Sequence, residues 1–239
     1  MLLYYYLYMN KIITFVPDKS TFMNFFYKRL ESVNITQKEL ENIIGQDCEL
    51  LFNKVYERFS LFKSEYFRKD NKVQIITGHF CQFFFILFEL SKILYELNRE
   101  DLANIVYFLN TTQMSCDLSF KVDLPLRTYI DHPLGSVIGR HVKFNSEKMF
   151  IFTTNCTIGG NFQKNGEWKF PEIDGDFVML ANSSLIGNNI IKGQVILSNG
   201  CYIKDEGVLE NVLVFGRSPN LIFKSIPDKI NPYFEKFKN

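Results

Sequence analysis

The stretch that decides the fold is IDGDFVMLANSSLIGNNIIKGQVILSNGCYIKDEGVLENVLVFGRSPNL, residues 173–221. Every sixth residue in it is apolar. These residues are Ile173, Met179, Leu185, Ile191, Leu197, Ile203, Leu209, Phe215 and Leu221. A helix repeats near 3.6 residues and a strand near 2, so neither element alone produces this spacing. A triangular solenoid does, because each flat face takes six residues and turns one apolar side chain into a narrow interior.

A shorter run with the same spacing lies upstream. It contains Phe120, Leu126, Ile138, Phe144 and Phe150, and His132 stands where one apolar member is missing. The two runs are separated by residues 159–172, which are rich in Gly, Asn and Lys. We therefore predict that the solenoid begins near residue 113 and that residues 159–172 leave it as a loop.

The first half of the chain is predicted to be helical. Thr36 and Glu39 form a capping box before residues 41–59, and residues 101–109 have apolar side chains at helical spacing. Residues 80–97 are strongly apolar, but Glu89 and two further charged residues interrupt them. Because charge is costly inside a bilayer, this segment is predicted to be a buried helix and not a membrane span. His79, just before it, is expected to cap or pack.

The composition excludes some classes of function. The chain has 27 basic and 26 acidic residues and no block of like charge, which argues against a nucleic-acid binder. Its five cysteines are scattered without metal-ligand spacing, which indicates reduced thiols in a cytoplasmic protein. The first residues, MLLYYYLYMNK, lack a basic segment and a small-residue cleavage site, so we expect no signal peptide, and Met9 is an alternative start.

Three motifs in the second half carry a family resemblance. They are YIDHPLGSVIGRHV at 129–142, CTIGGN at 156–161 and VFGRSPN at 214–220. Together they resemble the serine acetyltransferases, which are hexapeptide-repeat acyltransferases, and in particular a divergent branch associated with surface polysaccharides. The resemblance runs from about residue 116 to residue 224. It implies an α+β chain: a helical domain at 1–112, a left-handed parallel β-helix at 113–224 and a tail at 225–239.

The resemblance also implies an activity and its partners. The chain is expected to be an acetyl-CoA-dependent O-acetyltransferase that needs no metal and forms a homotrimer or a dimer of trimers. His132 is expected to be the general base, because a neutral imidazole can take a hydroxyl proton near neutral pH. Asp117, fifteen residues earlier, is the acid expected to orient that imidazole and complete the catalytic pair. Asp131 is expected to help hold the acceptor.

The remaining expected site residues come from the loop and the closing coils. Gly159 and Gly160 are candidates for close backbone approach to the acyl donor. The cationic side chains expected to contact the phosphates of coenzyme A are Lys192, Lys204 and Arg217, with Lys224 as a further candidate. Lys169 and Phe170 stand where the family has an Arg-His pair. Since lysine cannot clamp a carboxylate as arginine does, free L-serine is expected to be a poor acceptor.

Several functions remain open at this stage. The favoured acceptor is a hydroxyl of a sugar, a glycan precursor or a small metabolite. The alternatives are a serine O-acetyltransferase of cysteine biosynthesis and a non-catalytic β-helix scaffold. A hexapeptide-repeat carbonic anhydrase needs three histidines around zinc, and it is disfavoured because the third histidine, His79, lies in the helical half. His141 is predicted to be a surface residue.

Overall fold

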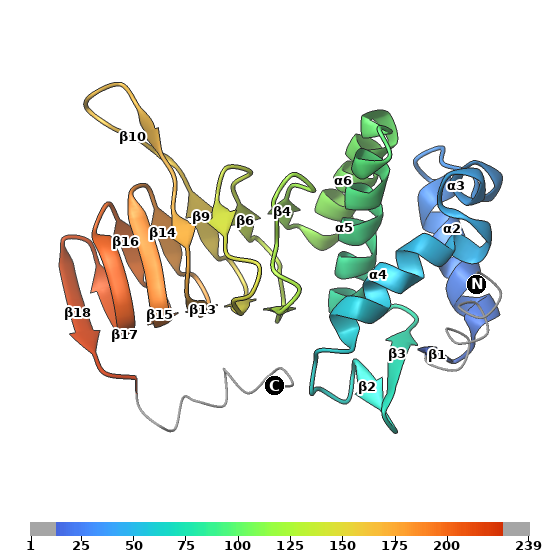
Figure 1. The fold of residues 1–239 in the computed structure, drawn as a ribbon, viewed down its shortest axis with the longest axis horizontal. Helices are drawn as coiled ribbons and strands as arrows, with labels where there is room; N and C mark the ends of the chain where they lie inside the picture. Colours follow the sequence, from blue (N-terminus) through green and yellow to red (C-terminus); the bar gives the residue numbers. More distant parts are fainter. Residues whose placement is uncertain (1–12, 227–239) are drawn as a thin grey trace. The chain divides into compact units, whose positions relative to one another are not determined.

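A computed structural model describes residues 13–226, and the signal-peptide, start-site and most of the tail predictions fall outside this range. The chain forms two compact units that divide between Gln113 and Met114. Figure 1 shows helices in the first unit and stacked short strands in the second. Between residues 13 and 226, no helix combines the length and apolarity needed to cross a bilayer.

The first unit contains helices and a small sheet. Its helical elements are α2 (Lys19–Glu31), α3 (Gln37–Ile44), the 3₁₀ turn η1 (Gln46–Cys48), α4 (Glu49–Phe59), α5 (Phe80–Glu96) and α6 (Glu100–Met114). Three strands, β1 (Ile13–Val16), β3 (Lys72–Ile76) and β2 (Arg68–Lys69), form a sheet in the order β1-β3-β2. The expectation of helices alone was therefore incomplete, because this unit also contains a three-stranded sheet. Its strands are too short to show a clear periodic pattern in the sequence.

Capping residues define where these helices begin. The Thr36 side chain accepts a hydrogen bond from the Glu39 backbone N–H, which confirms the predicted cap. His79 caps α5, since its Nδ1 accepts from the Gln82 N–H at 3.3 Å. The capping role predicted for His79 is thus confirmed. The expected helix through 41–59 is interrupted at Gly45, whose φ of +89° ends α3 before α4 starts.

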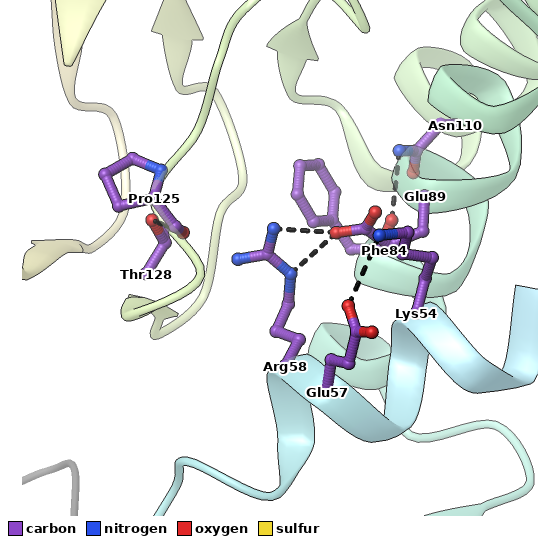
Figure 2. A network of polar contacts seen from close by, with 8 residues as sticks. All are labelled: Lys54, Glu57, Arg58, Phe84, Glu89, Asn110, Pro125 and Thr128. Atoms are coloured by element: carbon purple, nitrogen blue, oxygen red, sulfur yellow. Dashed lines mark hydrogen bonds and ion pairs between the residues drawn. The ribbon is translucent and has the colours of Figure 1, made fainter. Parts of the chain in front are cut away.

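Helix α5 is buried on nearly all sides, as expected of a helix that is apolar around its circumference. Its one buried acid, Glu89, is neutralised by Arg58 of α4, and Figure 2 shows this pair. Arg58 Nε donates to Glu89 Oε1 at 2.8 Å, and its guanidinium lies 5.0 Å from the centre of the Phe85 ring. The charge that argued against a membrane span is therefore part of a buried ion pair.

The second unit is a parallel β-helix with three faces. The first face contains β4 (Asp117–Leu118), β6 (Val137–Ile138), β9 (Thr157–Gly159), β14 (Ser184–Ile186) and β16 (Tyr202–Lys204). The second face contains β5 (Thr128–Ile130), β8 (Phe150–Phe152), β13 (Asp176–Met179) and the later halves of β15 (Asn189–Leu197) and β17 (Gly207–Arg217). The third face contains β7 (Lys143–Phe144), β12 (Glu172–Ile173) and the earlier halves of β15 and β17. Strand β18 (Asn220–Lys224) pairs antiparallel with β17.

The apolar register holds through the middle coils and fails at both ends. Its members from Ile173 to Leu209 are at most 3% exposed. Phe215 is not the inward residue, because β17 pairs Leu197 with Val214, and Val214 is fully buried. Leu221 lies on the antiparallel β18 and is also not buried. At the other end Leu126 is 42% exposed, and Ile130 takes the inward position on β5.

A column of left-handed backbone conformations runs along the corner between the second and first faces. It contains Ser115, Gly135, Asn155, Asn182 and Gly200, with φ between +49° and +72°. Asn, Gly and Ser make such tight turns because they tolerate positive φ or hydrogen-bond locally. From Gly135 onward each residue donates its N–H to a carbonyl of the preceding coil, as from Asn155 to Leu134 and from Asn182 to Thr154, and Ser115 O accepts from Gly135. This column sets the regular geometry from which the candidate site departs.

Candidate functional site

The corner that contains His132 is longer than the other corners of the same column. The connections at 153–156, 180–183 and 198–201 have four residues, whereas the one from Asp131 to Ser136 has six. Gly135 takes the regular left-handed position, so the additional residues lie before it. The sequence position of His132 indicated that it interrupts the inward apolar register. The structure shows that it does not lie in that register. It belongs to a widened corner that lifts its side chain away from the coil.

The backbone of His132 is held in an uncommon conformation. Its φ is +56°, which costs about 1–2 kcal/mol for a residue with a Cβ atom. The hydroxyl of Thr154 donates to its carbonyl at 2.9 Å and helps fix this geometry. The side chain is 78% exposed, and its Nε2 lies 3.5 Å from Asp131 Oδ1. Strained residues that their surroundings hold in place are a feature of functional sites.

Asp117 lies on β4, the strand adjacent to this corner. Its backbone N–H donates to Ser136 O at 2.8 Å, and Gly135 N–H donates to Ser115 O at 2.7 Å. These two hydrogen bonds join the segment that contains Asp117 to the turn that contains His132. The structure thus brings Asp117, Asp131 and His132 to one corner of the β-helix.

The predicted loop at 159–172 contains a β-hairpin made of β10 (Asn161–Phe162) and β11 (Trp168–Lys169), which projects from the stacked strands (Figure 1). Its base is fixed to a later coil by Asp205. That carboxylate accepts hydrogen bonds from Asn188 N–H, Asn161 Nδ2 and Gln163 Nε2. Burial alone would raise the pKa of Asp205, but these bonds outweigh it and hold the pKa below its usual value. The hairpin is therefore anchored by an ionised carboxylate.

A cavity of about 330 Å³ lies at the corner from which the hairpin leaves the coil, and Phe170 and Lys169 are among its lining residues. The Phe170 ring covers Gly160, where a Cβ atom would come within 2.5 Å of the ring. Gly160 is thus needed to seat an aromatic side chain, whereas Gly159 pairs with Ile186 on the first face. Lys169 is ion-paired with Glu167 at 3.1 Å, and this lysine holds the pKa of Glu167 below its usual value.

A second cavity, of about 540 Å³, lies beside the first and shares Lys169 and Asn188 with it. Lys204 and Lys164 also line it, so three cationic side chains surround this space. The other cations expected to contact coenzyme A are elsewhere. Lys192 is exposed on the third face, Arg217 lies over the Tyr202 ring, and Lys224 lies over the Phe215 ring.

His141 is exposed, which confirms its prediction as a surface residue, but the sequence did not predict that it lines the first cavity beside Phe170. Its ring centroid lies 4.9 Å from that of Phe170, and the two residues belong to consecutive coils. The signal was present in the spacing, because each residue precedes the inward residue of the third face by three positions, Phe144 for one and Ile173 for the other. Aligning the coils across the excursion would have placed them side by side.

The cysteines do not present nucleophiles. All five are buried and none forms a disulfide. Burial raises the pKa of Cys201 to about 11 and also raises the pKa of Cys116, so both remain thiols near neutral pH. In the part of the chain from 13 to 226, no group of three His, Cys, Asp or Glu side chains is placed to hold a metal ion.

Comparison with solved structures identifies the fold. The chain superimposes on serine acetyltransferase from Brucella abortus strain S19 with a TM-score of 0.63 and 17% identity, covering 87% of this chain and 84% of that one. It also matches a serine acetyltransferase in complex with CoA (TM-score 0.60, 12% identity, 83% of each chain) and the Neisseria gonorrhoeae enzyme (0.54, 17%, 85% and 79%).

This chain has the serine acetyltransferase fold. The predicted architecture, a helical N-terminal part followed by a left-handed parallel β-helix, is thereby confirmed. No protein-family model matches the sequence, and no curated protein matches it significantly. The likeness therefore lies in the fold.

Proposed function

We propose that this chain is an O-acetyltransferase that moves an acetyl group from acetyl-CoA to a hydroxyl of a sugar, a glycan precursor or a small metabolite. The observation that carries the proposal is the widened corner, which presents His132 in a strained conformation beside Asp131 and next to the strand of Asp117. A coil corner that served only packing would not require two additional residues or an exposed imidazole.

The chemistry assigns one task to each residue of this corner. His132 takes the proton of the acceptor hydroxyl as the oxygen attacks the thioester carbonyl, and later returns it to the departing thiolate. Asp117 acts as a positioning residue: bound to the other ring nitrogen, it fixes the imidazole tautomer and stabilises the imidazolium. Asp131 lies close enough to His132 to orient the acceptor at the same place.

The donor is proposed to be acetyl-CoA. One structural relative was solved in complex with CoA, and the cavity lined by Lys164 and Lys204 offers cations suited to the phosphates of that molecule. When bound, the donor supplies the activated acetyl group. The chain's own part is to hold the phosphates and to place the thioester carbonyl within reach of the general base.

The complete site is proposed to form between copies of the chain. The His132 corner joins the second face to the first, whereas Lys169 and Phe170 lie where the first face leads to the third. The width of the first face separates these corners within one copy. A homotrimer, in which one corner of each copy meets a different corner of its neighbour, would unite them.

The test is an acetyl-transfer assay with purified protein and acetyl-labelled acetyl-CoA. We expect label to move to a sugar hydroxyl, with free L-serine used poorly, and we expect His132→Asn to abolish transfer. If no acceptor among sugars, hydroxy acids and hydroxyamino acids takes label above the rate of the variant, the proposal is wrong and the chain is a scaffold.

A further inference from the structure

The cavity beside the hairpin is lined in part by His141, which the reaction described above does not use. Strands β7 and β12 pair Lys143 with Glu172, so the residues just before them also lie side by side. This register brings His141 against Phe170 with ring centroids 4.9 Å apart and the rings tilted by 52°, and His141 lines the 330 Å³ cavity. Arg140 Nε donates to His141 Nε2 at 3.0 Å. In this hydrogen bond the imidazole is the acceptor, at Nε2.

Arg140 directly precedes the lining residue His141 and lies beside the cavity, whose own lining cations are Lys143 and Lys169. Lys143 is ion-paired with Glu172 at 3.0 Å and Lys169 with Glu167 at 3.1 Å, so both lysines already have carboxylate partners. Across the described range, 13–226, no carboxylate pairs with the exposed guanidinium of Arg140. Its hydrogen bond to the imidazole uses Nε and leaves the two terminal nitrogens available. These nitrogens can still bind one carboxylate through two parallel hydrogen bonds.

The same cavity has an aromatic wall. Trp168 keeps 60% of its surface exposed although two rings flank it, Phe162 at 5.6 Å and Phe170 at 6.1 Å between centroids. The Phe170 and Trp168 rings are nearly parallel, with an interplanar angle of 21°. An open ring face offers apolar contact to the C–H surface of a hydroxylated ring. Asn188, which also lines the cavity, adds an amide for its hydroxyl groups.

We propose that this cavity selects an acceptor that is a hydroxylated ring carrying a carboxylate, as in a uronic acid. The carboxylate binds the guanidinium of Arg140, and the ring lies against Trp168. His141 is a positioning residue, because its hydrogen bond holds the Arg140 side chain beside the cavity and it does not itself need to touch the ligand. This inference rests on the proposed function, because only that function makes the bound molecule an acetyl acceptor. The binding itself can be measured without turnover.

The sequence contains a single tryptophan, Trp168, so intrinsic tryptophan fluorescence reports on this cavity alone. The protein is titrated with methyl glucuronide, methyl glucoside and L-serine, which carry respectively a ring with an acid, a ring alone and an acid alone. We expect the glucuronide to bind about 10- to 100-fold more tightly than the glucoside, the range given by one charge-assisted bidentate contact. L-Serine is expected to bind at least about tenfold more weakly than the glucuronide, because it makes no ring contact.

Variants assign the effect to Arg140 and His141. In Arg140→Gln the glucuronide should bind no better than the glucoside, and Arg140→Lys should recover only part of the difference, since lysine cannot form the fork. His141→Gln should weaken glucuronide binding and leave glucoside binding unchanged. The matched control is Arg29→Gln, an exposed arginine of the helical unit, which should change neither affinity.

Each outcome separates this inference from the proposed function. Preferential glucuronide binding without any acetyl transfer would support the inference and refute the proposed function. Acetyl transfer with equal binding of glucuronide and glucoside would support the proposed function and refute the inference. Binding of L-serine as tight as that of the glucuronide would overturn the ring requirement, and an unchanged preference in Arg140→Gln would overturn the role of the guanidinium.

Discussion

Replacing His132 by asparagine separates catalysis from folding more cleanly than an alanine substitution does. The side chain is 78% exposed, so its loss removes little buried surface. The backbone is in the left-handed region at φ +56°, which asparagine tolerates better than alanine. We therefore expect the free energy of unfolding to change by no more than about 0.5 kcal/mol.

The effect on activity is expected to be far larger. Loss of a general base lowers the rate by about 10²- to 10⁴-fold, which corresponds to about 3–5 kcal/mol in activation free energy. The loss should fall mainly on kcat, because the imidazole acts on the proton in transit. The assay follows CoA release from acetyl-CoA at pH 7.5, with denaturant unfolding measured on the same preparations.

The matched control is His79→Asn, because asparagine can also cap a helix and His79 lies in the helical unit. This variant should retain wild-type turnover. A folded His132→Asn protein with kcat within a few-fold of wild type would refute the assignment of the base. A large loss of stability in His132→Asn would instead refute the reasoning about the left-handed corner.

Four further outcomes are expected. Asp117→Asn should lower kcat with little change in KM, since the amide favours the wrong imidazole tautomer; a rise in KM alone would indicate an acceptor-binding role. Glu89→Gln should destabilise the chain by about 3–5 kcal/mol in denaturant unfolding, because an uncharged amide replaces the carboxylate that neutralises the buried Arg58, and a change below about 1 kcal/mol would contradict this. Burial lowers the pKa of His79 from 6.5, so the unfolded chain binds the proton more readily than the folded chain. The contribution of neutral His79 to the free energy of unfolding should therefore be fully present above pH 6.5 and decrease as the pH falls below it. His79→Asn should flatten this pH dependence in thermal melts at pH 5 to 8. Light scattering at micromolar concentration should give a trimer or a hexamer, and a stable monomer would exclude a site shared between copies.

The architecture could be predicted from the sequence because each regular coil face contributes one buried apolar residue at a fixed spacing. One buried side chain per six residues is visible wherever the coils are regular, as from Ile173 to Leu209. The six-residue spacing no longer identifies the buried residue where a coil changes length. The last coil passes from the third face to the second through Asn211 with one residue fewer than the coil before it, so Val214 takes the place expected for Phe215. No local feature of the sequence reveals that deletion.

The candidate site was only partly predictable for a related reason. His132 was singled out from its motif, but its exposure depends on a corner whose length shows only when several corners are compared. The contact between His141 and Phe170 joins residues 29 positions apart across the hairpin excursion. Such contacts depend on which coils are neighbours. The partner of Glu89 was likewise invisible, since Arg58 lies on another helix.

The antiparallel strand β18 has a consequence for how the chain behaves at high concentration. A stack of parallel coils ends in a strand whose free backbone groups can pair with another molecule and begin a fibre. From Leu213 to Arg217 that edge is occupied by β18 of the same chain. The replacement edge is short and runs in the opposite direction, so it does not continue the parallel pattern of the stack. The final turn therefore prevents another molecule from extending the parallel stack along this part of β17.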